Sequence, residues 1–127
     1  MEPELKSILT EYTELSAFSP RPKEHDHHLI YGSGLKELAD EDGLILPLCA
    51  DEHNVCQDGD RTKLIHGNPA AGHLSKMLGQ VAWEEYYTAK LFAKKYELTG
   101  TTEDEYARAV MREAREAFRR RYGISYL

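Results

Sequence analysis

The chain has 127 residues, enough for one hydrophobic core and too few for two independent ones. Hydrophobic residues make up 41% of it and charged residues 30%, which is typical of a soluble globular protein and excludes a disordered chain. The net charge of −6 argues against broad nucleic-acid binding, because that binding depends on neutralising phosphates. The longest apolar runs, such as residues 44–49, are far too short to cross a bilayer.

The N-terminal residues are acidic and lack the basic and apolar regions of a signal peptide. The sequence therefore predicts a cytoplasmic protein that does not associate with a membrane. In that reducing compartment, Cys49 and Cys56 are better candidates for thiols or metal ligands than for a disulfide.

In the first part of the chain, apolar residues at helical spacing predict a short amphipathic helix over residues 3–15. The Ser-Pro-Arg-Pro sequence at 19–22 breaks this pattern, and residues 23–31 are expected to form a short strand or an extended arm. After a Gly-Ser-Gly turn, residues 35–42 are expected to form one or two helical turns that end at Gly43.

In the second part, residues 44–48 are short and apolar and are the best strand candidate, although their proline limits the strand to an edge. A short helix is predicted over residues 49–57, followed by a loop over 60–71. Two longer helices complete the chain, one over residues 72–98 and one that begins at a capping-box sequence at 102–105. Together these elements predict a single domain with an α+β, mostly helical fold.

Histidines and cysteines gather at two places in the sequence. Residues 24–28 contain three of the six histidines, and Cys49, His53 and Cys56 follow the second predicted strand. Within a helix, spacings of four and three residues put these last three side chains on one face. A helix face opposite a histidine pair on a strand is a good geometry for a metal site. The same histidines also suit a solvent-exposed polar loop with no ligand, and Cys56 suits a buried position.

Several short motifs follow one another between residues 26 and 85. They are His27-His28, Gly32-Ser33-Gly34 with Lys36, Asp42-Gly43-Leu44, Leu46-Pro47-Leu48-Cys49, His53, Ile65-His66-Gly67-Asn68-Pro69, and Gln80 with Ala82-Trp83-Glu84. In this order and spacing the segment, a little under half of the chain, resembles the HNH endonuclease superfamily, whose core is a ββα-metal finger. More narrowly, it is similar to phage-encoded recombination-enhancement (Ref-like) nucleases and related small prophage HNH proteins.

The resemblance implies a metal finger over residues 23–71, preceded by an N-terminal helix and arm (1–22) and followed by a helical hairpin (72–127). It implies a divalent metal ion, Mg²⁺, Mn²⁺ or Zn²⁺, held by His27 and His53. It also implies that His28 is the general base that activates a water molecule for attack on a phosphodiester. The implied activity is metal-dependent hydrolysis of DNA by a phage or prophage protein, with a phage or host recombination partner.

Further residues are accessory candidates for this site. Asn54, His66, Asn68 and Cys49 lie where related fingers have residues near the metal, the phosphate or a zinc knuckle. His25 and His73 are expected to be surface residues. The basic residues that are candidates for nucleic-acid contact also suit a solvated helix face, and they are Lys63, Lys76, Arg119, Arg120 and Arg121.

The chain departs from the family pattern at the central asparagine, which would orient the catalytic histidine and which maps to about Leu44. Two alternatives to a nuclease therefore stay open. One is a non-enzymatic nucleic-acid- or protein-binding module, in which Cys49, His53 and Cys56 join a histidine of the doublet around a structural zinc. The other has no working metal site and uses the long helices to bind a partner. These helices are also a candidate homodimer surface.

Overall fold

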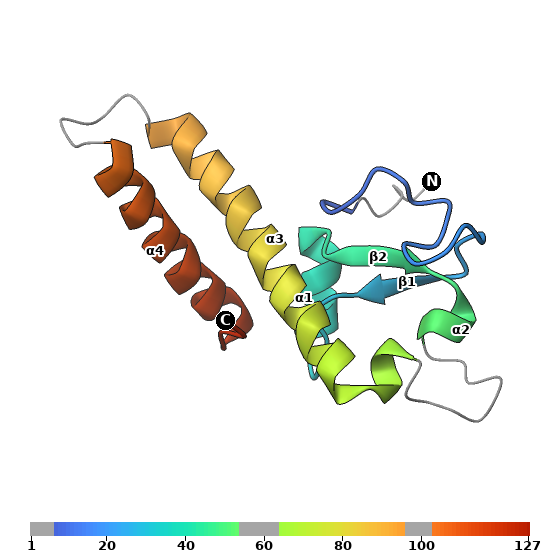
Figure 1. Ribbon diagram of the computed structural model, residues 1–127. Helices are drawn as coiled ribbons and strands as arrows, with labels where there is room; N and C mark the ends of the chain where they lie inside the picture. Colours follow the sequence, from blue (N-terminus) through green and yellow to red (C-terminus); the bar gives the residue numbers. More distant parts are fainter. Residues whose placement is uncertain (1–6, 54–63, 96–102) are drawn as a thin grey trace.

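The computed structural model describes residues 7–53, 64–95 and 103–127 of the chain (Figure 1). A two-stranded antiparallel sheet lies beside short helices and a long helical hairpin. In chain order the elements are β1 (His25–His28), α1 (Leu35–Asp42), β2 (Ile45–Leu48), α2 (Ala50–His53), the 3₁₀ helix η2 (Ile65–Gly67), α3 (Pro69–Lys95) and α4 (Glu103–Tyr122). The predicted α+β, mostly helical fold class is confirmed. None of the described helices is long and apolar enough to cross a membrane.

The two strands are joined through α1, and all three elements lie where the sequence predicts them. In the antiparallel pair, His27 is opposite Leu46 and His28 is opposite Ile45. α1 ends at Gly43, whose φ of 71° lies in the left-handed region that closes helices and that glycine adopts without strain. The chain turns there into β2. The predicted helix over 49–57 is α2 in the structure, and its expected continuation beyond residue 53 lies outside the described residues.

The helix predicted over residues 3–15 is wrong for the described part of that range, because residues 7–15 form no helix. The Ser7 hydroxyl donates to the Ile45 carbonyl at 2.6 Å, and the Ile8 N–H donates to the Gly43 carbonyl at 2.9 Å. Serine and threonine side chains bond readily to nearby backbone and so compete with helix formation. This N-terminal segment instead runs along the start of β2, where its apolar residues still reach the core.

The long helix α3 begins at Pro69, three residues before the predicted start, because Asn68 caps it. The Asn68 side-chain oxygen accepts hydrogen bonds from the N–H groups of Ala70 and Ala71 at 3.1 and 3.2 Å. Proline suits the first position of a helix, where no N–H is needed. Asn68 and Pro69, which fall within the loop predicted over residues 60–71, are therefore a helix start, and η2 precedes them.

Small residues of α3 allow the chain that follows β1 to approach the helix closely. A methyl group added at Gly79 would lie 2.9 Å from the Ile30 Cγ1 atom and 3.0 Å from the Leu29 Cβ atom. One added at Gly72 would lie 2.5 Å from the Tyr31 hydroxyl oxygen. All three distances are shorter than ordinary contacts of a side-chain carbon atom. The glycines thus fix how near β1 and its histidines lie to α3.

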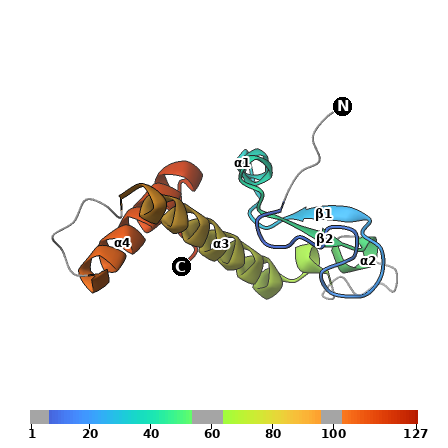
Figure 2. The same cartoon turned by 90° about the horizontal axis from the view of Figure 1, so that it is seen from above.

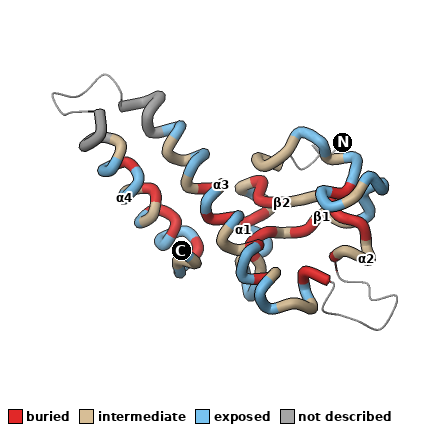
Figure 3. The backbone as a smooth tube through the Cα atoms, in the orientation of Figure 1, coloured by how far each residue is buried: buried red, intermediate tan, exposed pale blue. Residues whose placement is uncertain are grey.

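One hydrophobic core joins the sheet region to the helical hairpin. Leu29, Ile30 and Leu44 are buried against Trp83 of α3 and Phe118 of α4. Figure 3 shows the buried residues in red, at intervals along the strands and along α3 and α4. The far end of the hairpin extends away from the sheet, as the view from above makes clear (Figure 2).

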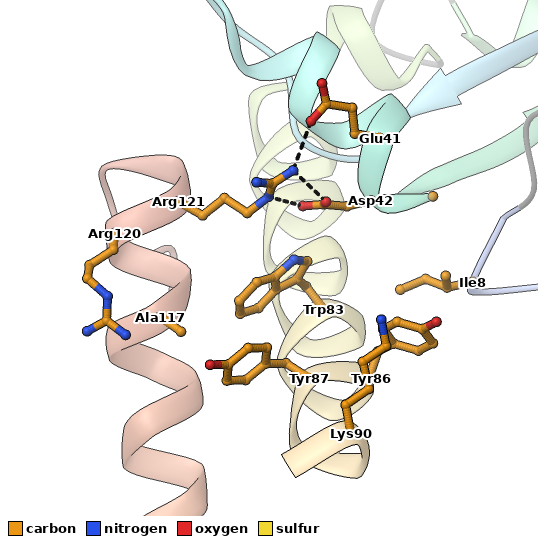
Figure 4. A pocket seen from close by; sticks show the side chains of 11 residues that line it. Ile8, Glu41, Asp42, Trp83, Tyr86, Tyr87, Lys90, Ala117, Arg120 and Arg121 are labelled. Carbon is orange, nitrogen blue, oxygen red and sulfur yellow. Dashed lines mark hydrogen bonds and ion pairs between the residues drawn. The ribbon is translucent and has the colours of Figure 1, made fainter. Parts of the chain in front are cut away.

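An ion-pair cluster connects the end of α4 to the end of α1. The Arg121 guanidinium donates to the Asp42 carboxylate at 2.6 and 2.7 Å and to Glu41 at 3.0 Å (Figure 4). The Tyr122 hydroxyl donates to the same Asp42 carboxylate at 2.6 Å. Of the three arginines proposed for nucleic-acid contact, Arg121 is thus bound to carboxylates and Arg119 pairs with Glu116 at 2.9 Å. Arg120 is exposed at the edge of the pocket drawn in Figure 4.

Candidate metal centre

Three histidines from three different elements converge beside the sheet. His27 comes from β1, His53 from the end of α2 and His66 from η2. One ring nitrogen from each lies within 4.8 Å of a ring nitrogen of the other two. The ring centroids are 4.6 to 5.1 Å apart. His27 and His53 are buried, whereas His66 is exposed, so one side of the cluster is open to solvent.

The hydrogen bonds of His27 determine which of its nitrogens is free to bind a metal. The Ser75 hydroxyl donates its only proton to the Leu29 carbonyl at 2.8 Å. The His27 Nε2 atom, 2.8 Å from the Ser75 oxygen, must therefore be the donor in that second bond. A neutral His27 then carries its proton on Nε2 and a lone pair on Nδ1. That Nδ1 atom is buried and has no hydrogen-bond partner among the described residues, which fits a nitrogen that coordinates a metal.

His53 contacts one histidine through each of its nitrogens. Its Nε2 atom is 2.8 Å from the His66 Nε2 atom, and its Nδ1 atom is 3.0 Å from the His25 Nδ1 atom. Two nitrogens on a tetrahedral zinc ion would be about 3.3 Å apart, so the His53–His66 pair needs only a small separation to admit a metal. His25, which the sequence left as a surface residue, is half-buried and serves as an outer partner that orients the ring.

The three histidines are electrically neutral at pH 7. Burial, together with the charges of the neighbouring histidines, lowers the pKa of His27 to about 3. The pKa of His53 is lowered to about 4, first by burial and then by His66, His25, His28 and Lys36. Burial also lowers the pKa of His66, with further contributions from Lys36 and His28. Neutral imidazole is the form that coordinates metals, so the cluster need not lose protons to do so.

His28, the second residue of the doublet, has different surroundings from His27. Successive side chains of a strand point to opposite faces, and the His28 Nε2 atom bonds to the Asp40 carboxylate of α1. The carboxylate accepts the Nε2 proton, which leaves the Nδ1 lone pair of a neutral His28 free to take up a proton. Its side chain keeps 13% of its surface exposed. The pair has the composition of a histidine base oriented by a carboxylate.

Cys49 does not join the three histidines. It lies before the first residue of α2, so the four-residue spacing to His53 does not put both on one helix face. The thiol is buried 3.5 Å from the Pro22 carbonyl oxygen. Cys49 forms a second group with Asp51 and Glu52. In that group Arg21 pairs with the Asp51 Oδ2 atom at 2.7 Å, and the Ser16 and Ser19 hydroxyls donate to Glu52. Each carboxylate thus has a partner already, although the Asp51 Oδ1 atom is buried without one among the described residues.

The remaining site candidates fall into two groups. Asn68 caps α3, and Lys76 lies on α3 one residue after Ser75. Asn54, Lys63 and the second cysteine, Cys56, lie outside the described residues.

Besides His25, sequence reasoning missed three contributors to this centre, Asp40, Ser75 and Lys36. Asp40 and Ser75 act through the tertiary structure, twelve and forty-eight residues from the histidines they bond. Lys36 is exposed on α1 and is close enough that its charge lowers the pKa of His53 and His66. The only local signal was Lys36 itself, which belongs to the motif at residues 32–36.

Comparison with known proteins adds no further identification: no family model, no curated protein and no solved structure matched the chain.

Proposed function

We propose that the chain is a metal-dependent nuclease of the HNH type that hydrolyses phosphodiester bonds of DNA. The observation that carries this proposal is the convergence of three neutral histidines, one with an unpartnered buried nitrogen, together with a histidine–carboxylate pair at the following residue of β1, close enough for the charge of His28 to act on all three. Separate residues are thus available for metal binding and for proton transfer, as a metal-assisted hydrolase requires.

His27, His53 and His66 would hold the metal, with His66 as a third ligand beside the two expected from the sequence. Three protein ligands with one solvent-facing side leave a coordination position for water or a phosphate oxygen, which is typical of catalytic and not of structural sites. A bound divalent ion would supply Lewis-acid stabilisation of the negative charge on the phosphate and on the departing oxygen.

His28 would act as the general base. Its Nδ1 atom takes a proton from water while the water oxygen forms a bond to phosphorus, and the bond from phosphorus to the sugar oxygen breaks. The departing oxygen leaves with the electron pair of that bond and is protonated from solvent. Asp40 holds the Nε2 proton of His28 throughout, and so fixes the ring and stabilises the imidazolium that forms. Asp40 would thus orient the catalytic histidine, the role expected of the central asparagine of the HNH pattern, which this chain lacks.

The test is a plasmid-nicking assay with Mg²⁺, Mn²⁺ or Zn²⁺, combined with metal titration monitored by thermal stability. We expect the wild-type protein to nick DNA and to be stabilised by the metal that supports nicking. His28→Ala should lose nicking by at least about 100-fold and keep the metal-induced stabilisation. Glu37→Ala, which removes an exposed carboxylate of α1 outside the histidine cluster, is the control and should behave as the wild type. Undiminished nicking by His28→Ala would remove the proposed base.

A structural zinc site in a non-enzymatic binding module is the second candidate, and the burial of His27 and His53 favours it. The number of protein ligands on the metal distinguishes a nuclease from a structural zinc module. Spectroscopy of the cobalt-substituted protein is expected to report three histidine nitrogens and bound water for a nuclease. A spectrum with four protein ligands, including thiolate, would support the structural alternative.

A further inference from the structure

A pocket other than the one drawn in Figure 4 adjoins the candidate metal centre and shares His66 with it. The pocket has a volume of about 340 Å³ and lies between η2, the first turns of α3 and the segment after α4. Its polar lining consists of Tyr31, His66, His73, Lys76 and Tyr126, together with Asn68 at its edge. Among the residues that the structure describes, no aspartate or glutamate lines it. In a chain with a net charge of −6, this makes the pocket unusual.

Lys76 is the charged group of this pocket, and aromatic rings hold it. Its ammonium nitrogen lies 4.6 Å from the centre of the Tyr31 ring and 5.7 Å from that of Tyr126. Among the described residues, Lys76 forms no ion pair with a carboxylate. Its positive charge is therefore available to an anion, while cation–π contacts restrict where it points.

The two rings are themselves fixed in place. Tyr31 lies over Gly72, and a methyl group added there would lie 2.5 Å from the Tyr31 hydroxyl oxygen, so glycine makes room for the ring in this position. Tyr126 is fixed by Gln80, a fully buried residue whose amide oxygen accepts the Tyr126 N–H at 2.6 Å. The Gln80 amide nitrogen donates to the Ser125 hydroxyl at 2.9 Å. A buried amide with both ends bonded thus holds the segment after α4 against the pocket.

The first residues of α3 line the same pocket, so the positive end of this 27-residue helix adds to its potential. Lysine, histidine and tyrosine side chains beside a helix start suit a phosphate group. The volume suits one nucleotide unit and is far too small for a duplex.

We infer that this pocket binds the nucleotide unit next to the cleaved bond, with Lys76 on its phosphate, and that the substrate strand is single at this point. The inference rests on the proposed nuclease function for the identity of the substrate. It depends on the charge, the shape and the position of the pocket beside His66, and it assigns to Lys76 a part in binding and none in the chemistry.

The experiment compares Lys76→Gln with Lys90→Gln in the full chain. Lys90 is a matched control, since it lies on the same helix and also stacks on a tyrosine, 4.4 Å from the Tyr86 ring (Figure 4). Both variants are made in the His28→Ala background, which prevents cleavage, and binding of a labelled single-stranded oligonucleotide is measured over a range of salt concentrations. We expect Lys76→Gln to weaken binding about 5- to 10-fold and to reduce the salt slope by about 0.7, the loss of one phosphate contact. Lys90→Gln should leave both unchanged, and Lys76→Arg should restore most of the affinity.

The outcomes separate this inference from the proposed function. If Lys76→Gln weakens binding and the wild type does not nick DNA, the nucleotide pocket stands and the nuclease proposal fails. If the wild type nicks DNA while Lys76→Gln binds with unchanged affinity and salt slope, the nuclease stands and the pocket assignment fails. Three further results would also overturn the assignment. They are an equal loss of affinity in Lys90→Gln, a loss of affinity seen only with a duplex probe, and no binding of the oligonucleotide by the parent protein. Thermal unfolding of each variant verifies that it is folded.

Discussion

At the scale of single residues, the two adjacent histidines of β1 have separate surroundings because a strand turns successive side chains to opposite faces. His27 is buried against Ser75, whereas His28 bonds to Asp40 of α1. The same doublet thus supplies one candidate ligand and one candidate base.

This arrangement predicts the effect of removing Asp40. Asp40→Ala should lower kcat for DNA cleavage about 10- to 100-fold, because His28 loses the group that fixes its ring and its tautomer. Metal affinity and KM for DNA should change little. Asp40→Asn, whose amide oxygen can still accept the Nε2 proton, should be intermediate. Steady-state nicking kinetics measure kcat and KM for both variants.

Glu37→Ala is the control, since Glu37 is another carboxylate of α1 and is exposed. An equal loss of activity in Glu37→Ala would mean that general charge near the site, and not the contact with His28, is responsible.

The parts of this centre that the sequence indicated are those with local patterns. The doublet at 27–28 and His53 after the second strand follow from spacing along short elements. Asp40 and Ser75 have no such pattern, since their partners are set by how α1 and α3 pack on β1. His66, an accessory candidate in the sequence, joins the cluster only because η2 folds back towards α2.

At the scale of elements, predictions succeeded where capping and turn residues agree with the hydrophobic pattern. α1 begins and ends as expected because Gly34 and Gly43 bound it. The helix expected over residues 3–15 was predicted from the hydrophobic pattern alone. In residues 7–15 the hydrogen bonds of Ser7 and Ile8 to the start of β2 take the place of helical hydrogen bonds. The start of α3 was missed because Asn-Pro also occurs at turns, and the capping bonds are visible only in the structure.

The close approach of α3 to the chain after β1 predicts an unusual effect of alanine. Glycine to alanine within a helix normally stabilises it by about 1 kcal/mol. Gly79→Ala should instead lower the free energy of unfolding by about 1 kcal/mol or more, because the new methyl group meets Leu29 and Ile30 at 3.0 Å or less. Urea unfolding measures this change. His73→Ala, on the exposed face of the same helix, should have no such cost. A stabilised Gly79→Ala protein would contradict the close contact.

At the scale of the whole molecule, charge is distributed unevenly. The carboxylates of the α1 end are neutralised by Arg121, and those of α2 by Arg21. In the part of the chain that the structure describes, the pocket beside His66 is lined by no carboxylate. A negative net charge is therefore compatible with local anion binding, which composition alone could not indicate.

The buried histidines also determine how the stability of the whole chain depends on pH. In the folded state the pKa of His27 is about 3 and that of His53 about 4, against an ordinary value of 6.5. Below pH 6.5 the unfolded chain binds protons at these positions and the folded chain does not, so protons favour unfolding. The stability that these neutral, buried imidazoles contribute is fully present above pH 6.5. It is lost as the pH falls towards 4, the folded-state pKa of His53, and then towards 3, that of His27. Each histidine should remove about 1.4 kcal/mol per pH unit in this window.

The measurement is urea unfolding between pH 7 and 5 in the presence of a chelator, a range in which most carboxylates stay ionised. His27→Asn should reduce the slope of stability against pH, because one of the neutral buried imidazoles no longer titrates in the unfolded chain. His73→Asn should leave the slope unchanged, since His73 is exposed in the folded protein. A slope near zero in the wild type would mean that the folded state accepts protons at the cluster, and that the three rings are not packed together as the structure has them. Adding the metal that supports nicking should raise stability throughout the range, since a ligand of the folded state alone stabilises it by mass action.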